Sequence, residues 1–502
     1  MNQEQILLNR IAELEVQLAR ETEEKTYFKT QYQSVLEQFR LAQQKQFGTS
    51  AEGFDAQGDL FNEAEEIVLD VENEQQEISY TRKKPTRKPL PKDLPREQIV
   101  HDIPESEKQC GCCGGELHKM GESVSEKLEF IPASIKVIEH IRPKYACREC
   151  EKSGTENTIK QAKMPPSPIE KGIATPSLLA QIITSKYQYA LPLYRQESLF
   201  KQHGIELSRQ TMSDWMIKSA HLFEPLYDRL KAELLKQPAI HADETPLKVL
   251  ESDKKKSYMW VYCSGTDAPK ENCFLKNIVL YDYQNSRAGA CPDAYLQGYA
   301  GYLQADGYQG YAQTKATLAG CWAHARRKFM DIKKIQGKKK TGKVDVILSL
   351  IQKLYGIESK IKDKTPEEKY AARQKDAKKI IDKINAWLEK TQPTTLQKTK
   401  LGDAVTYLAN QWDKLIVYLD DGHLNIDNNR AERAIKPFVI GRKNWLFSNT
   451  AKGADASAML YSIIETAKSN NLIPFDYIKA CLQELCQPKP NIDTLLPWNF
   501  KG

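Results

Sequence analysis

The chain has 502 residues, 40% of them apolar and 28% charged, and its net charge is +7 from 73 basic and 66 acidic residues. This length allows two to four domains, and the composition is too apolar for a disordered chain. No run approaches the roughly 18 consecutive apolar residues of a membrane span, and the first residues lack the pattern of a secretory signal. We therefore expect a multidomain cytoplasmic protein with no membrane partner.

The N-terminal segment predicts one long helix, because residues 1–45 contain neither Gly nor Pro. A heptad frame places apolar residues at nine of twelve a and d positions, with a polar break at Glu21 and Lys25. A lone helix cannot bury that stripe, so we predict a self-associating, leucine-zipper-like coiled coil over 1–48. Packing of the helix on its own globular domain is the alternative. An acidic block followed by a basic, proline-containing block predicts a charged linker over 49–98.

The cysteines are clustered near the end of this linker. Cys110 and Cys113 form one C-x-x-C pair, and Cys147 and Cys150 form a second. Two such turns can place four sulfurs around Zn²⁺, whereas free thiols are the alternative. The total of eleven cysteines is odd, which disfavours a disulfide framework. We predict a zinc ribbon over 99–165 whose closed four-sulfur site is structural.

The next segment, 170–235, predicts helices with a helix-turn-helix-like arrangement. Gly204 makes a turn between two short helices, and Ser208 caps the second one. Arg209 and Gln210 then face outward from the apolar side of that helix and are candidate DNA contacts. An ordinary helical hairpin is the alternative interpretation.

A mixed α/β order follows. AIHADETPLKVL, YMWVYCS and NIVLYDY predict three successive strands, and a short helix follows at about 288–297. GYLQAD predicts a fourth strand that ends at Asp306, and ATLAGC predicts a fifth strand running into a helix. Residues 331–420 predict a Lys-rich helical segment. Nine basic residues lie from Arg326 to Lys343, either against a DNA backbone or on a solvated face.

Three carboxylates stand out by their context. Asp243 ends the first predicted strand, Asp306 ends the fourth, and Glu432 lies early on a helix that contains NNRAERAIKP. Carboxylates at the ends of neighbouring strands can share one crevice, and a helix laid across that edge can add a third. Such a group suits two Mg²⁺ ions and phosphodiester chemistry. Spacing alone does not separate Asp243 from the adjacent Glu244, and surface carboxylates remain the alternative.

Several long segments make a family recognisable. The chain resembles bacterial transposases of the insertion-sequence-66 family, the large DDE-type subunit, nearly end to end. The resemblance rests on the zipper-like N-terminus, the double C-x-x-C, HADETPLKV, LQADGYQGY, AGCWAHARRKF, NIDNNRAERAIKPFVIGRKNWLFSNTAKGA and LLPWNF. It implies an α/β ribonuclease-H-like catalytic core over 236–330 and 421–470. Residues 331–420 would then be a helical insertion, and 471–502 a C-terminal element.

The resemblance also implies roles for single residues. By motif, the catalytic triad that holds two Mg²⁺ or Mn²⁺ ions is Asp243 in HADET, Asp306 in QADGY and Glu432 in NNRAER. The family's C-x-x-H matches Cys321 and His324. These two residues would support the active site together with Asn428, one helical turn before Glu432. Further DNA contacts are expected at Arg326, Arg327, Arg433 and Lys436.

The function implied by the resemblance is that of a DNA transposase, which binds transposon ends, cleaves DNA and joins the 3′ ends to target DNA. Zinc would be structural and magnesium catalytic. The expected partners are transposon-end and target DNA, a second copy of the chain and small accessory proteins of the same element. The protein would be associated with the bacterial nucleoid when bound to DNA. A non-catalytic DNA-binding regulator derived from a transposase is the alternative.

Overall fold

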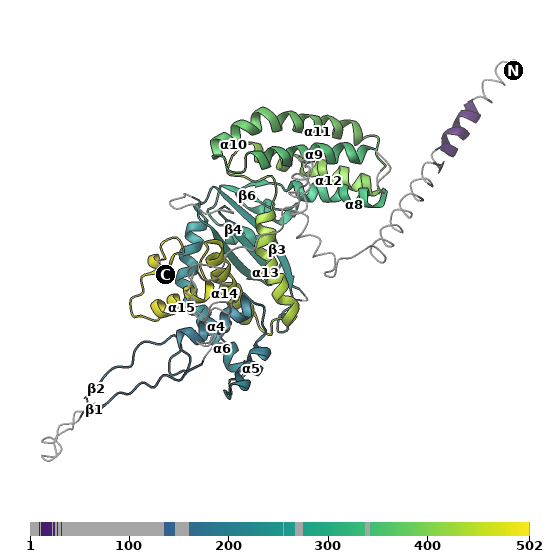
Figure 1. The fold of residues 1–502 in the computed structure, drawn as a ribbon. Helices are drawn as coiled ribbons and strands as arrows, with labels where there is room; N and C mark the ends of the chain where they lie inside the picture. Colours follow the sequence, from purple (N-terminus) through teal and green to yellow (C-terminus); the bar gives the residue numbers. More distant parts are fainter. Residues whose placement is uncertain are drawn as a thin grey trace, which may run out of the picture. The chain divides into compact units, whose positions relative to one another are not determined.

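The computed structural model describes residues 10–32 in part, 135–145, 160–254, 256–266, 275–336, 342–396 and 398–500. The chain divides into two compact units, one formed by 1–76 with 165–502 and the other by 77–164. The predicted linker and the four predicted zinc ligands lie outside the described residues, as does much of the predicted coiled coil, of which 12–22 is helical. The smaller unit contains a two-stranded antiparallel pair, β1 (Lys144–Tyr145) and β2 (Lys160–Gln161) (Figure 1). Among the described residues, no helix is long and apolar enough to cross a bilayer.

A five-stranded mixed sheet organises the larger unit, in the order β5-β4-β3-β6-β7 (Figure 1). The first three strands pair antiparallel, whereas β6 lies parallel to β3 and β7 lies parallel to β6. A short helix, α7 (Ala290–Tyr295), precedes β6, as predicted. The order of five strands and one helix therefore agrees with the sequence prediction. The strands are β3 (Ala239–Leu247), β4 (Ser257–Ser264), β5 (Ile278–Gln284), β6 (Tyr302–Gln304) and β7 (Thr317–Ala319).

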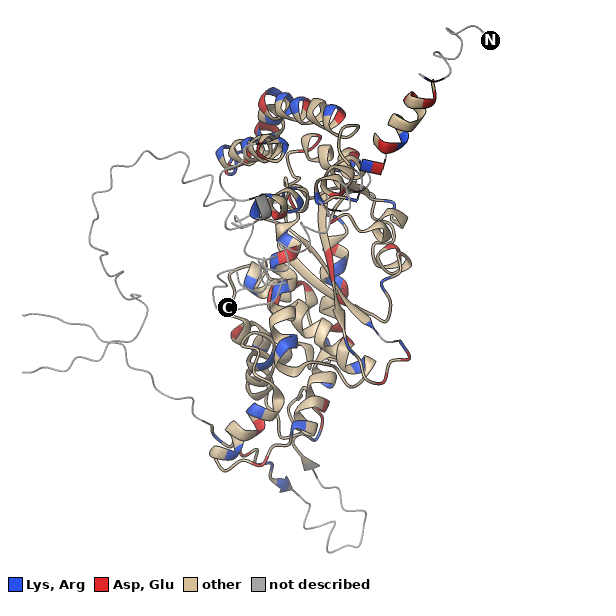
Figure 2. Ribbon diagram, turned by 90° about the vertical axis from the view of Figure 1, so that its right-hand side faces the viewer, with Lys and Arg blue, Asp and Glu red and all other residues tan. Residues whose placement is uncertain are grey.

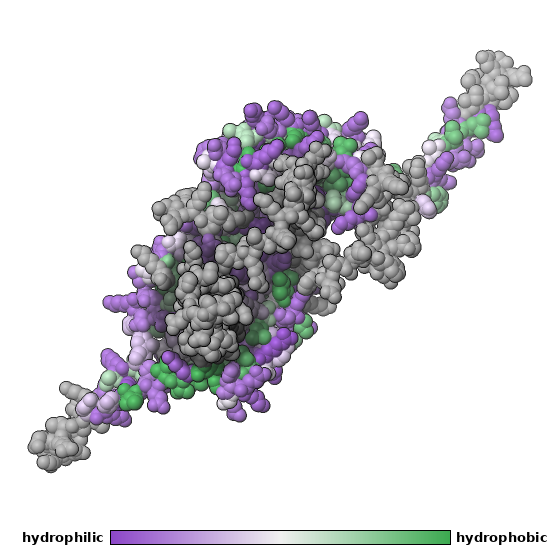
Figure 3. All heavy atoms as spheres, in the orientation of Figure 1, coloured by the Kyte–Doolittle hydropathy of each residue, from purple (hydrophilic) through white to green (hydrophobic). Residues whose placement is uncertain are grey.

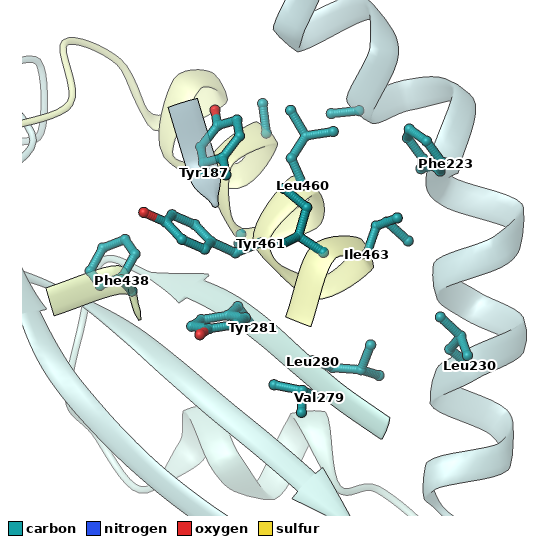
Figure 4. Close-up of a cluster of buried hydrophobic side chains, with 14 of the residues drawn as sticks. Tyr187, Phe223, Leu230, Val279, Leu280, Tyr281, Phe438, Leu460, Tyr461 and Ile463 are labelled. Atoms are coloured by element: carbon teal, nitrogen blue, oxygen red, sulfur yellow. The ribbon is translucent and has the colours of Figure 1, made fainter. Parts of the chain in front are cut away.

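One edge of this sheet is covered by α14 (Ala451–Ser469). Its hydroxyl groups bond to the backbone of the edge strand β5: Val279 N–H donates to Thr466 Oγ1 at 3.0 Å, and Tyr281 N–H donates to Ser462 Oγ at 2.7 Å. These bonds satisfy an edge that would otherwise expose unpaired peptide groups. Figure 4 shows the apolar side of α14, with Leu460 and Ile463, between the sheet and the long helix α6 (Arg209–Leu234). The C-terminal helix α15 (Pro474–Leu485) packs against α14.

The helices before the sheet begin where their caps predict. Thr175 caps α4 (Pro176–Tyr187), and Ser208 caps α6 (Arg209–Leu234), with α5 (Leu193–Gln202) between them. The prediction of two short helices is wrong for α6, which has 26 residues. Its buried stripe continues beyond the predicted face because apolar residues recur at helical spacing along its whole length. In Figure 3, exposed apolar residues gather near α4 and α5, and those of this segment are Ile173, Tyr189, Tyr194 and Leu199.

The described residues of the segment 331–420 are largely helical, as predicted, and they share an apolar core with Ala319, Trp322 and Phe329, which precede the segment. It lies between α8 (Trp322–Gln336), which follows β7, and α13 (Asn429–Trp445), which returns to the sheet beside β3 and β4. Figure 2 shows Lys and Arg mixed with Asp and Glu on these helices, so the segment is not uniformly basic. Its helices are α9 (Lys343–Lys360), α10 (Pro366–Ala372), a π-helical turn (Arg373–Ala377), α11 (Lys378–Thr391) and α12 (Lys400–Ile416).

Candidate active site

One predicted carboxylate, Asp243, lies on β3, and a second, Asp306, lies two residues after the end of the neighbouring parallel strand β6. β3 and β6 pair with His241 opposite Gln304, so the same register continued by two residues brings Asp306 opposite Asp243. The predicted strand ends are wrong. β3 continues through Asp243 to Leu247 because its pairing with β4 extends that far, and β6 ends at Gln304, two residues before Asp306.

The third carboxylate comes from the helix that lies beside this strand. Glu432 is in the first turn of α13, and 4% of the residue is exposed. Burial raises the pKa of Asp243 well above its usual range, and the negative charges of Glu244, Asp306 and Glu432 raise it further. The three predicted residues therefore converge closely enough to repel one another. A divalent cation that binds oxygen ligands would lower this repulsion between the three carboxylates.

Glu244, which the sequence could not separate from Asp243, has a different environment. Its side chain is 2% exposed, and it accepts hydrogen bonds from Arg287 Nε at 2.9 Å and from Tyr311 Oη at 2.6 Å. Asp243 instead accepts one bond from the Glu244 peptide N–H at 2.8 Å. Because the Glu244 carboxylate is already paired with the Arg287 guanidinium and accepts a hydrogen bond from the Tyr311 hydroxyl, Asp243 is the better candidate metal ligand of the two.

Asn428 anchors the start of α13 to β3. Its Nδ2 donates to Ala242 O at 2.8 Å, and its Oδ1 lies 3.1 Å from His241 Nδ1. The other ring nitrogen of His241 faces Asn425 Nδ2 at 3.3 Å, so these partners assign the imidazole proton to Nδ1. Asn428 is the N-cap residue of α13, and its carbonyl accepts from Glu432 N–H at 3.3 Å. Asn428 therefore orients Glu432 through the backbone, and its side chain points to β3.

Cys321 and His324 lie beside Glu432. One ligand atom of each of the three residues lies within 4.8 Å of the others, and His324 Nδ1 is 3.6 Å from Glu432 Oε1. Burial, followed by the positive charge of Arg327, lowers the pKa of His324 to about 4. The imidazole is therefore neutral at neutral pH. The predicted pair thus borders the carboxylate group and brings no cation of its own to it.

Comparison with known families accounts for most of the chain. The model of the transposase IS66 family matches residues 171–456, which include Asp243, Asp306 and Glu432. The chain belongs to this family. Three further family models match: "zinc-finger binding domain of transposase IS66" at 107–151, "Transposase C of IS166 homeodomain" at 35–99 and "IS66 C-terminal element" at 462–498. This IS66 chain therefore carries zinc-binding, DNA-binding and transposase domains.

Relatives of this IS66 protein are uncharacterized proteins of Sinorhizobium fredii. The protein y4hP is 34% identical over 84% of this chain and 78% of its own length. The protein y4jD is 34% identical over 82% of each chain, and y4qI is 32% identical over 88% of this chain and 83% of its own. The similarity thus spans most of each chain.

The predicted DNA contacts of the IS66 chain differ in exposure. Arg209 and Gln210, at the start of α6, are exposed, and so is Arg433. Lys436 and Arg327 are half-buried. Arg326 is a correction, because only 9% of the residue is exposed and it leaves little surface for DNA. Arg326 is on α8, which packs against α9 and α12 of the helical insertion.

The basic run within and after α8 has partners within the protein at some of its residues. Lys333 forms an ion pair with Asp345 at 2.5 Å, and Lys343 donates to Thr394 at 2.8 Å. Residues 337–341 lie outside the described residues. The described part of the run therefore has local partners, as expected for a charged surface with both signs present.

Several residues of the site were missed by the sequence analysis. Four of them lie inside the family segments HADETPLKV and LQADGYQGY, so the sequence could have marked them as site residues: His241, Gln304, Tyr308 and Tyr311. Tyr308 N–H donates to Asp306 Oδ1 at 2.9 Å, and Gln304 bonds with the backbone of residue 425. Arg287, whose guanidinium lies 4.0 Å from the centre of the Tyr308 ring, had no signal. Its role depends on a loop that meets β3 only in the folded chain.

Proposed function

We propose that this chain is an active DNA transposase that cleaves DNA at transposon ends and joins the 3′ ends to target DNA. The convergence of Asp243, Asp306 and Glu432 from two strands and a helix carries the proposal. The sheet supports a ribonuclease-H-like core, since three antiparallel strands are followed by two strands parallel to the first. The intact carboxylate group favours an enzyme over a non-catalytic regulator.

The donor set fits divalent cations with hard oxygen ligands, and Asp243, Asp306 and Glu432 would hold two Mg²⁺ or Mn²⁺ ions. Such ions, when bound, activate an attacking water or 3′-hydroxyl and stabilise the leaving oxygen. Asn428 fixes the first turn of α13, so Glu432 faces the strands in a defined position. The neutral His324 avoids adding positive charge next to Glu432.

The remaining parts of the chain serve DNA binding and assembly in this proposal. Arg209, Gln210 and Arg433 are exposed and would contact phosphates or bases, with Arg327 and Lys436 adding partial contacts. The zinc-finger domain would hold one structural Zn²⁺ through the four cysteines of the two C-x-x-C pairs. The N-terminal zipper would bring two chains and two DNA ends together, with small accessory proteins of the same element as further partners.

The test is metal-dependent nicking of a labelled duplex that contains a transposon end. Asp243→Asn, Asp306→Asn and Glu432→Gln each keep the side-chain shape and remove one negative charge. We expect each to lower cleavage at least about 10²–10³-fold, because a strong electrostatic group leaves the active site. DNA binding, measured by mobility shift, should persist in all three variants.

Asp293→Asn is the matched control, because Asp293 is an exposed carboxylate on α7 and is not one of the three converging carboxylates. It should cleave like the wild type. Strong cleavage by the Glu432→Gln protein, or cleavage in excess chelator, would contradict the proposal. A wild type that binds ends without cutting them in Mg²⁺ or Mn²⁺ would favour the regulator.

A further inference from the structure

A second group of metal-ligand types lies next to the three carboxylates. Cys321, His324 and Glu432 bring a thiol, an imidazole and a carboxylate within 4.8 Å of one another. The donors of a tetrahedral zinc site lie about 3.3–3.8 Å apart, as follows from bonds of about 2.0–2.3 Å. His324 Nδ1 and Glu432 Oε1 already meet that spacing at 3.6 Å. Small side-chain rotations would bring Cys321 Sγ to the same centre.

The imidazole nitrogen that faces this group, Nδ1 of His324, makes no hydrogen bond to the described residues. The whole side chain is 23% exposed, although Nδ1 itself is buried. A buried ring nitrogen without a partner is costly unless something binds it. A metal ion held by all three residues would satisfy that nitrogen.

The Cys321 sulfur accepts hydrogen bonds from two peptide N–H groups, and the backbone on either side of it is also hydrogen-bonded. The peptide N–H of Asn428 donates to Cys321 Sγ at 3.2 Å, and the N–H of His324 bonds to the same sulfur. The residues on either side are tied down, since Gly320 N–H donates to Lys414 O at 2.9 Å and Trp322 N–H donates to Ile426 O at 3.1 Å. Burial and the negative charges of Asp427 and Glu432 nevertheless raise the pKa of the Cys321 thiol well above its usual range, so the thiol would give up its proton only to a bound metal ion.

The charges around the group favour a bound cation over a vacant site. Asp427 and Glu432 place negative charge near Cys321, and Asp306 places negative charge near His324. The positive charges of Arg327 and Lys328 act on His324 in the opposite sense. A thiol and an imidazole are poor ligands for Mg²⁺ and good ligands for Zn²⁺ or Co²⁺. The group of Cys321, His324 and Glu432 therefore favours Zn²⁺ or Co²⁺, whereas the three carboxylates favour Mg²⁺.

We infer that Cys321, His324 and Glu432 form a binding site for a Zn²⁺-class transition-metal ion, separate from the magnesium ligands except for Glu432. Three protein ligands leave a fourth position open, as in exchangeable zinc sites. Glu432 cannot bind both kinds of ion fully at once, so a bound transition metal would weaken Mg²⁺ binding at the three carboxylates and inhibit catalysis. This inhibitory consequence, unlike the binding itself, rests on the proposed function.

Metal binding is tested on the full chain without any DNA. The protein is first given one equivalent of Zn²⁺ per chain, which fills the closed site of the zinc-finger domain ahead of the open three-ligand site, and Co²⁺ is then added. The wild type should bind one further ion and show a thiolate-to-cobalt charge-transfer absorption. Cys321→Ser should abolish that absorption, and His324→Gln should weaken Co²⁺ binding at least about 10–100-fold. Cys291→Ser, which removes a half-buried thiol elsewhere, should titrate like the wild type.

Two results would overturn the inference: a wild type that binds no ion after zinc loading, or a Cys321→Ser protein that titrates like the wild type. If Cys321→Ser does not fold, judged by circular dichroism, His324→Gln decides alone. In a second arm, Zn²⁺ should suppress Mg²⁺-dependent nicking by the wild type. The fractional loss should be smaller in Cys321→Ser. Absence of any nicking would refute the proposed function and leave the cobalt result standing, so the two failures are distinguishable.

Discussion

Replacing Asn428 with Ala tests whether the contact between α13 and β3 positions the active site. Asn428 is buried, and its amide spans from Ala242 O at 2.8 Å to His241 Nδ1 at 3.1 Å. The truncation removes two hydrogen bonds, each worth about 0.5–1.5 kcal/mol net, and leaves the buried Ala242 carbonyl without this donor. We expect the free energy of unfolding to fall by about 2–3 kcal/mol.

Cleavage should fall further than stability alone explains. Asn428 sets the first turn of α13, and Glu432 is in that turn. A displacement of about 1 Å at a reacting centre costs on the order of 10²-fold in rate. The assay is Mg²⁺-dependent nicking at a temperature where urea denaturation shows the variant to be folded. Saturating DNA separates this loss from weaker binding.

Asn429→Ala is the matched control for this prediction. Asn429 is the next residue along, and its side-chain oxygen is buried without a hydrogen-bond partner among the described residues. Its contact with Asp427 is made by the backbone N–H, which the substitution keeps. If Asn428→Ala unfolds at the same urea concentration as Asn429→Ala and cleaves at the wild-type rate, the positioning argument is refuted.

Three further predictions concern stability and DNA binding. Arg373→Ala should lower the free energy of unfolding by about 3–5 kcal/mol in urea denaturation, because it leaves the Glu358 carboxylate and three backbone carbonyls without their buried cation. Burial raises the pKa of Asp282 to about 6, so its stabilising effect is present at low pH and is lost as the pH rises through 6. Asp282→Asn should therefore gain about 1.4 kcal/mol relative to the wild type between pH 5 and pH 8, and parallel pH profiles of the two proteins would contradict this. Arg209→Ala should weaken end binding and reduce the slope of log affinity against log salt by about 1, whereas an unchanged slope would remove Arg209 from the DNA contacts.

The local features of this chain could be predicted because each depends on a few neighbouring residues. Ser208 and Thr175 cap helices where their side chains can accept from the first turn. The five strands of the sheet were recognisable from short apolar runs, in the correct order. The Lys-rich segment 331–420 was predicted as helical, and it is. The family segments carried the identity of the candidate triad.

The convergence of the site was decided only by the tertiary structure. Asp243 and Glu432 are far apart in the sequence, and their proximity depends on the register of β3 and on the anchoring of α13 by Asn428. The same reasoning explains Glu244, whose partner Arg287 comes from a loop that no local pattern pairs with β3.

The burial of Arg326 likewise follows from packing between α8 and the insertion, although its charge suggested a DNA contact. A sequence pattern indicates the chemistry of a side chain and the face of the helix or strand on which it lies, because both depend only on nearby residues. Which of these residues meet is set by long-range packing and strand pairing. The sequence of this protein therefore determined its elements and its family, and the fold alone brought the carboxylates, the thiol and the imidazole together.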